Sequence, residues 1–95
     1  MTYKDDGTKD VAASANTKAA RKSLPVNLHQ HARRRLAYLV AARSLEDLKA
    51  WTGLGLHPLK ADRHGQYAIR INDQYRICFR WTKAGAEECE ITDYH

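Results

Sequence analysis

The second half of the chain carries side chains that suit the binding of a phosphodiester, at a spacing that brings them onto one surface. From residue 56 onward, a set of large apolar residues takes odd positions, and a set of cations with one tyrosine takes even positions. The odd set is Tyr67, Ile69, Ile71, Tyr75, Ile77 and Phe79, and the even set is Lys60, Arg70, Arg76, Arg80 and Tyr94. Successive side chains of a β-strand point to opposite faces, so the alternation predicts a sheet with one apolar and one cationic face. Guanidinium groups match phosphate oxygens with paired donors, and rigid strands would present them together.

The register of the first hairpin follows from keeping these two faces separate. A three-residue loop at residues 72–74 pairs Ile69 with Ile77 and Arg70 with Arg76, whereas a two-residue loop mixes the faces. Two arginines directly opposite each other cost stability unless an anion lies between them, and such conflicts occur mostly at functional sites. The alternative is that both side chains extend into water.

The same test predicts the other strand pairs. A loop at Thr82–Ala86 sets Ile77 against Ile91 and Arg80 against Glu88. A loop at Ala61–Gly65 sets Leu59 against Tyr67 and keeps Lys60 on the cationic side. The expected sheet is an antiparallel meander.

The first half of the chain predicts helices that cover the apolar face of this sheet. Alanines and a thin apolar stripe predict a helix over Asp6–Ala20, and Pro25 suits the start of a stronger helix that runs to Ala42. The apolar face of that second helix is formed by Leu28, Ala32, Leu36, Leu39 and Val40. Residues 44–47 have the pattern of a capping box, which predicts a short extra helix through Ala50. The fold class is therefore α+β, with two N-terminal helices packed on one face of a small antiparallel sheet.

Size and charge narrow the function. The chain has 95 residues, which we interpret as a single domain over 1–95, and its 16 Lys and Arg against 11 Asp and Glu give a net charge of +5. That excess favours a polyanionic partner. The sequence lacks an apolar run long enough for a membrane span and opens with a polar segment unlike a signal peptide, so we expect a cytoplasmic protein. Cys78 and Cys89 lack metal-site spacing and are expected to be free thiols.

A dense series of short motifs occupies the same half of the chain. They are Leu56-His57-Pro58-Leu59-Lys60, Asp62-Arg63, Gly65-Gln66-Tyr67, Ile69-Arg70-Ile71-Asn72, Tyr75-Arg76-Ile77-Cys78-Phe79 and Asp93-Tyr94-His95. With this series the chain resembles the HigB toxins, the plasmid-maintenance killer proteins of the RelE superfamily. The resemblance is dense from Leu56 to His95 and continues more thinly back through Ser44.

The resemblance implies a ribosome-dependent mRNA endonuclease that is inhibited by a HigA-type helix-turn-helix antitoxin from the same operon. It also implies the RelE-like α+β fold, in which the open face of the sheet holds the active site. By motif position, the residues that match those used for cleavage are Lys60, Arg76, Asp93, Tyr94 and His95, with His57 as a further active-site histidine. No metal or cofactor is expected, because the ribose 2′-hydroxyl of RNA supplies the nucleophile.

Roles within this set follow from charge and parity. We expect Arg76, with Arg70 behind it, to hold the phosphate, and the further candidates for substrate binding are Arg63 and Arg80. The candidates for proton transfer are Lys60, Tyr94 and His95. Asp93 has the wrong parity to touch the phosphate, so we expect it to orient His95 or Lys60. The odd parity of His57 points it toward the helices, which leaves a structural role open.

A further set of cations lies on the second predicted helix. Arg33, Arg34 and Arg35 occupy successive positions and therefore spread around the helix. Either they form a solvated surface, or they contact ribosomal RNA.

The N-terminal segment departs from the pattern of the family, and two alternative functions are considered. Residues 2–6 offer only Tyr3 to a core, so the short first strand of such toxins is expected to be weak or unformed. A ParE-like toxin would share the fold and inhibit DNA gyrase, but the set of Lys60, Arg76 and residues 93–95 argues against it. A non-catalytic basic RNA-binding module remains the second rival.

Overall fold

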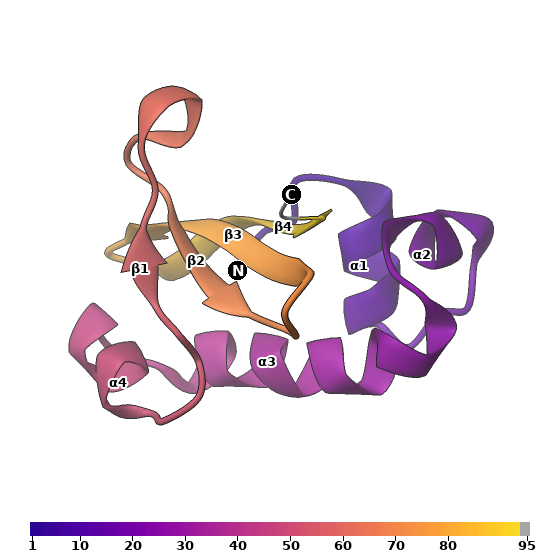
Figure 1. Cartoon of the computed structure of the whole chain (residues 1–95), viewed down its shortest axis with the longest axis horizontal. Coiled ribbons are helices and arrows are strands. Elements are labelled where there is room, and N and C mark those ends of the chain that lie inside the picture. Colours follow the sequence, from indigo (N-terminus) through magenta and orange to yellow (C-terminus); the bar gives the residue numbers. More distant parts are fainter. Residues whose placement is uncertain (94–95) are drawn as a thin grey trace.

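The computed structural model describes residues 1–93, which form a set of helices followed by an antiparallel sheet, so the predicted α+β class is confirmed (Figure 1). The helices are α1 (Asp6–Ala12), α2 (Lys18–Ser23), α3 (His29–Ala41) and α4 (Leu45–Ala50), with short 3₁₀ turns η1 (Val26–Leu28) and η2 (Ala61–Arg63). The strands are β1 (His57–Pro58), β2 (Tyr67–Arg70), β3 (Tyr75–Thr82) and β4 (Gly85–Asp93), which pair in the order β1-β2-β3-β4. Within residues 1–93, the structure contains no helix long and apolar enough to cross a membrane.

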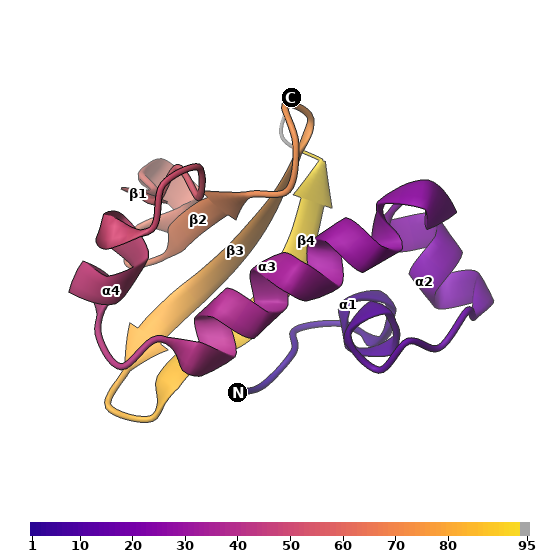
Figure 2. The ribbon, with the colours of Figure 1, turned by 90° about the horizontal axis from the view of Figure 1, so that it is seen from below.

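Helix α3 covers the apolar face of the sheet (Figure 2). Its buried stripe contains the predicted Ala32, Leu36 and Leu39, which join the main core with the inward residues of β2 and β3. Val40 is the exception, since it is 68% exposed and does not belong to that stripe. The predicted apolar face was therefore one position too wide, because residue 40 follows Leu39 by a turn of about 100° around the helix.

The single helix predicted over residues 6–20 is wrong, because the chain breaks there into α1 and α2. Ser14 adopts a left-handed conformation with a φ of 61°. Thr17 then caps α2 by accepting a hydrogen bond from the amide of Ala20 at 3.1 Å. Ser and Thr compete with helix hydrogen bonds in this way, so they end and start helices that alanine-rich patterns would continue.

Helices α1 and α2 pack closely at Gly7, which is buried. A Cβ atom at this position would lie 1.8 Å from Oγ of Ser23 and 2.8 Å from the carbonyl oxygen of Ala19. Glycine inside a helix normally lowers its stability, so close packing with α2 explains its presence.

We expect Gly7→Ala to destabilise the protein by about 1–3 kcal/mol through overpacking. Helix propensity alone predicts the opposite sign, a gain of about 1 kcal/mol. Urea unfolding followed by circular dichroism separates the two. Ser23→Ala in the Gly7→Ala background should restore part of the loss, because it removes the nearer of the two obstructing oxygens. A more stable single variant would contradict the packing argument.

The free edge of β4 is covered by the N-terminal segment. The first strand, expected to be weak or unformed, is a single parallel bridge between Tyr3 and Cys89. Next to it, the amide of Ile91 donates to Oγ1 of the buried Thr8 at 2.9 Å. These bonds occupy backbone groups that would otherwise leave β4 open to edge-to-edge pairing.

The register predicted for β2 and β3 is confirmed, with Ile69 opposite Ile77 and Arg70 opposite Arg76. Between β3 and β4 the prediction holds at Ile77 and Ile91 but is wrong nearer the turn, where Arg80 pairs with Glu87 instead of Glu88. A bulge accounts for the shift, and Glu88 takes a φ of 54° there. Bulges insert one extra residue and so move every later pair by one.

The register predicted for β1 is also wrong by one residue, since Pro58 rather than Leu59 lies opposite Tyr67. A slip of one residue moves side chains to the other face of the sheet. Leu59 accordingly packs with Ala68 and Cys78 in a second small core, on the face away from α3. That second core forms an apolar floor beneath the cations.

Candidate active site

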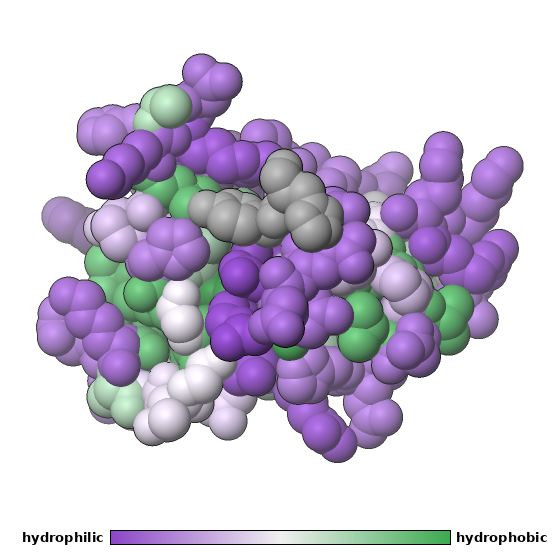
Figure 3. Space-filling view, in the orientation of Figure 1, coloured by the Kyte–Doolittle hydropathy of each residue, from purple (hydrophilic) through white to green (hydrophobic). Residues whose placement is uncertain are grey.

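The face of the sheet opposite α3 carries the predicted Arg70 and Arg76. No α-helix of residues 1–93 lies over this face (Figures 1 and 2). The corrected register of β1 does not support the predicted place of Lys60 beside them. Arg76 lies on β3 next to the hairpin loop, with Arg70 opposite it on β2 and Thr92 opposite it on β4. The loop of residues 59–66 rises from the same side (Figure 1). In the space-filling view, hydrophilic side chains cover this loop (Figure 3).

Arg76 is anchored by the hairpin loop that precedes its strand. Its Nη1 donates to the carbonyl oxygen of Asn72, and to that of Tyr75 at 3.2 Å. The side chain of Asn72 in turn accepts from the amides of Gln74 at 2.9 Å and Tyr75 at 2.7 Å. Asn72 is thus a positioning residue, although the sequence pattern indicated for it only a place in the loop. The tendency of Asn to accept from amides two residues on was the available signal.

Arg70 is held on two sides. Its guanidinium pairs with the carboxylate of Asp73 in the hairpin loop. Its amide donates to the carbonyl of Leu54 at 2.7 Å, and a Cβ on Gly55 would lie 3.0 Å from the aliphatic stem of Arg70. The like-charge conflict with Arg76 is therefore offset within the chain, by Asp73 on one side and by carbonyl oxygens on the other.

The other two predicted substrate-binding arginines also have carboxylate partners, which the sequence analysis did not anticipate for Arg63. Nη1 of Arg63 lies 3.0 Å from Oε1 of Glu90, and Nε of Arg80 lies 3.2 Å from Oε2 of Glu88. The hydrogen bond to Glu90 raises the pKa of Arg63, so this side chain stays charged. Exposed pairs such as Arg80 and Glu88 contribute only about 0–1 kcal/mol, so an incoming phosphate can compete for the guanidinium.

His57 lies on the open face, contrary to the prediction that it points toward the helices. The corrected register pairs it with Ala68, whose side chain belongs to the open-face core. Its Nδ1 lies 3.3 Å from the carbonyl oxygen of Gly55, at hydrogen-bond distance. Lys60 is exposed and stands at the base of the rising loop, where its carbonyl accepts from the amide of Arg63 at 3.1 Å.

The C-terminal candidates are described only in part. Asp93 lies opposite Tyr75, in line with its predicted parity, and its Oδ2 accepts from Nε2 of Gln74 at 3.0 Å. Tyr94 and His95 lie outside the described residues. Asp93 therefore also links the end of β4 to the loop that anchors Arg76.

The thiols are buried and free, as predicted. Burial, with a smaller contribution from Glu87, raises the pKa of the Cys89 thiol to about 12. The thiolate is the reactive form, so Cys89 is a packing residue and not a nucleophile at neutral pH.

The three arginines of α3 point to different surroundings. Nη1 of Arg33 donates to the carbonyl of Val11 at 3.4 Å and so links α3 to α1. Arg34 is exposed, and the Nε of Arg35 is buried. Their contact with ribosomal RNA stays a prediction.

Comparison with known proteins identifies the family. Residues 2–95 match the family described as the RelE-like toxin of type II toxin-antitoxin system HigB. The chain belongs to the HigB-like toxin family. A HigB-like relative, the Endoribonuclease HigB of Proteus vulgaris, is 40% identical over 40 residues. That match spans 42% of this chain and 44% of the relative.

Proposed function

We propose that this HigB-like protein is the toxin of a type II toxin-antitoxin pair and acts as a ribosome-dependent endonuclease on mRNA. One observation carries the proposal: Arg76 and Arg70 lie side by side on the uncovered face of the sheet. The name of the Proteus vulgaris relative, an endoribonuclease, supports the same activity.

The proposed reaction uses the nucleophile that RNA contains. The 2′-oxygen attacks the adjacent phosphorus, and the bond from phosphorus to the 5′-oxygen breaks. The products are a 2′,3′-cyclic phosphate and a 5′-hydroxyl. Negative charge on the phosphate grows in the transition state, so preorganised donors that meet it accelerate the reaction without a metal ion. Arg76 is suited to this role because the Asn72 and Tyr75 carbonyls hold its guanidinium in place before substrate binds.

Two proton transfers complete the reaction. A base must take the proton of the 2′-hydroxyl, and an acid must supply one to the 5′-oxygen. Lys60, Tyr94, His95 and His57 are the candidates for these transfers. We propose that Asp93 positions one of them.

The remaining arginines of the open face would bind the flanking RNA. Arg63 and Arg80 would leave their present partners, the carboxylates of Glu90 and Glu88, and bind phosphates along the RNA. Such contacts release counterions, so binding would weaken as salt is raised. The proposed partners are the ribosome with its mRNA and a HigA-type helix-turn-helix antitoxin, in the cytoplasm.

A reconstituted translation reaction tests the activity. The purified chain is added to mRNA with and without ribosomes, and cuts are mapped by primer extension. We expect cuts only when ribosomes are present, with 5′-hydroxyl ends. Cleavage of naked mRNA would contradict ribosome dependence.

The rival functions give different results in the same preparation. A gyrase inhibitor would leave mRNA intact and block DNA supercoiling by purified gyrase. A binding module would slow translation without producing any new 5′ ends. Either result would overturn the proposed activity.

A further inference from the structure

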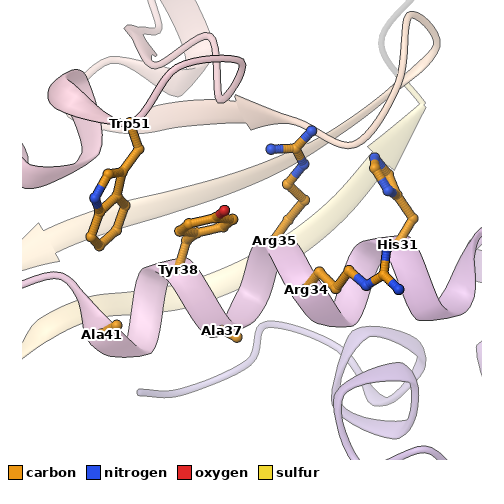
Figure 4. Close-up of a pocket in the computed structure, with 7 residues that line it drawn as sticks. All are labelled: His31, Arg34, Arg35, Ala37, Tyr38, Ala41 and Trp51. Carbon is orange, nitrogen blue, oxygen red and sulfur yellow. The ribbon is translucent and has the colours of Figure 1, made fainter.

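A second surface lies on the other side of the molecule from the open face of the sheet. It is a groove of about 620 Å³ along α3, closed at one end by Trp51, the residue that follows α4 (Figure 4). Its main lining residues are His31, Arg34, Arg35, Tyr38, Ala41 and Trp51. In Figure 4 the side chains of His31, Arg35 and Tyr38 project to the same side of the helix as Trp51. This stripe is separate from the buried stripe of α3.

The groove is divided by charge along its length. Its cations, Arg34 and Arg35, lie toward the start of α3 with His31, and its aromatic and small residues lie toward the end. Among residues 1–93, none of the groove-lining residues is acidic. An occupant therefore needs negative charge at one end and an apolar side chain at the other.

Arg35 adds a specific requirement for an acceptor. Its Nε is buried and has no hydrogen-bond partner among the described residues. The side chain as a whole is only partly buried and lines the groove, so its guanidinium can form a charge-assisted hydrogen bond with a carboxylate that enters there.

The aromatic end of the groove argues against RNA as the occupant. The rings of Tyr38 and Trp51 have centroids 5.0 Å apart and are tilted by 49°, so they contact each other and leave no slot for a base between them. An RNA strand also carries a phosphate at every nucleotide, whereas the cations here are confined to one end. A peptide segment with carboxylates next to an aliphatic side chain would suit both the cationic end and the aromatic end of the groove.

We infer that the α3 groove docks an acidic segment of a protein partner, with carboxylates at Arg35 and an aliphatic side chain against Tyr38 and Trp51. The identification of that partner as the antitoxin rests on the proposed function. The docking itself rests on the groove.

Peptide binding tests the inference. The sequence has two tryptophans, so in a Trp81→Phe background Trp51 is the sole tryptophan and reports on the groove. The probes are a small panel of short amidated peptides with glutamate and leucine at helical spacing, matched peptides with lysine in place of glutamate, and a uridine oligonucleotide. We expect saturable changes in Trp51 emission with the acidic peptides alone.

Variants locate the binding within the groove. Arg35→Gln should weaken the binding of the tightest acidic peptide by roughly tenfold or more, the loss expected for a charge-assisted hydrogen bond. Arg43→Gln is the matched control, because Arg43 is an exposed arginine that follows α3 and does not line the groove. Equal weakening by both substitutions would show only general attraction between charges and would overturn the inference. So would binding of the oligonucleotide in place of the peptides, or failure of the whole acidic panel.

A last pair of variants separates this inference from the proposed activity. Tyr38→Ala should lose peptide binding and keep mRNA cleavage, whereas Arg76→Ala should keep peptide binding. Thermal unfolding confirms that each variant is folded. If the parent protein cleaves no mRNA, the proposed function fails while the peptide result stands on its own. Loss of cleavage in folded Tyr38→Ala would show that the groove contributes to mRNA cleavage, and would overturn the inference that it is a separate docking surface.

Discussion

Replacing Arg76 by alanine is expected to lower the rate of ribosome-dependent mRNA cleavage by a factor of roughly 10²–10³, the usual loss for one preorganised donor to a developing charge. The guanidinium is held by two backbone carbonyls on the open face, so a water molecule or a neighbouring arginine would not reproduce its position. The measurement is the single-turnover cleavage rate on mRNA bound to programmed ribosomes.

Two further variants serve as controls for Arg76→Ala. Arg21→Ala removes the same charge from an exposed position on α2, away from the sheet, and should cleave at nearly the parent rate. Arg76→Lys keeps the charge but loses the planar pair of donors, so it should recover only part of the activity. If folded Arg76→Ala cleaves as fast as the parent protein, Arg76 is not the group that stabilises the transition state.

The largest expected effect on stability comes from Phe79→Ala. Phe79 is fully buried in the main core, where its ring stacks on Tyr67 with centroids 6.1 Å apart. Truncation of a buried phenylalanine costs about 3–5 kcal/mol, because the surrounding side chains collapse only partly into the cavity. The total free energy of unfolding of a folded domain is about 5–15 kcal/mol. The free energy of unfolding is obtained from urea denaturation.

Val40→Ala serves as the matched control for this measurement. Val40 is 68% exposed on α3, so its truncation should change the stability by no more than about 0.5 kcal/mol. A small loss in Phe79→Ala, comparable to that of Val40→Ala, would show that the apolar side of the sheet is not the main core.

Local alternation alone was enough to predict the central part of the molecule. Between Tyr67 and Phe79 the large apolar residues take odd positions and the arginines take even ones. A shift of one residue would bury Arg70 and Arg76, so only one register keeps the faces apart. The cap at Ser44 and the stripe of Leu36 and Leu39 were predictable for the same reason, since each depends on neighbours in the chain.

Contacts between distant segments decided the rest. β1 has only two residues, too few for alternation to specify its register, and its pairing with β2 brought His57 to the open face and Leu59 over Cys78. The bulge at Glu88 depends on how β4 meets both β3 and the N-terminal segment. The carboxylate partner of Arg63 and the groove between α3 and Trp51 likewise join residues far apart in sequence. Such arrangements arise from packing in three dimensions, which periodicity along one strand or helix does not encode.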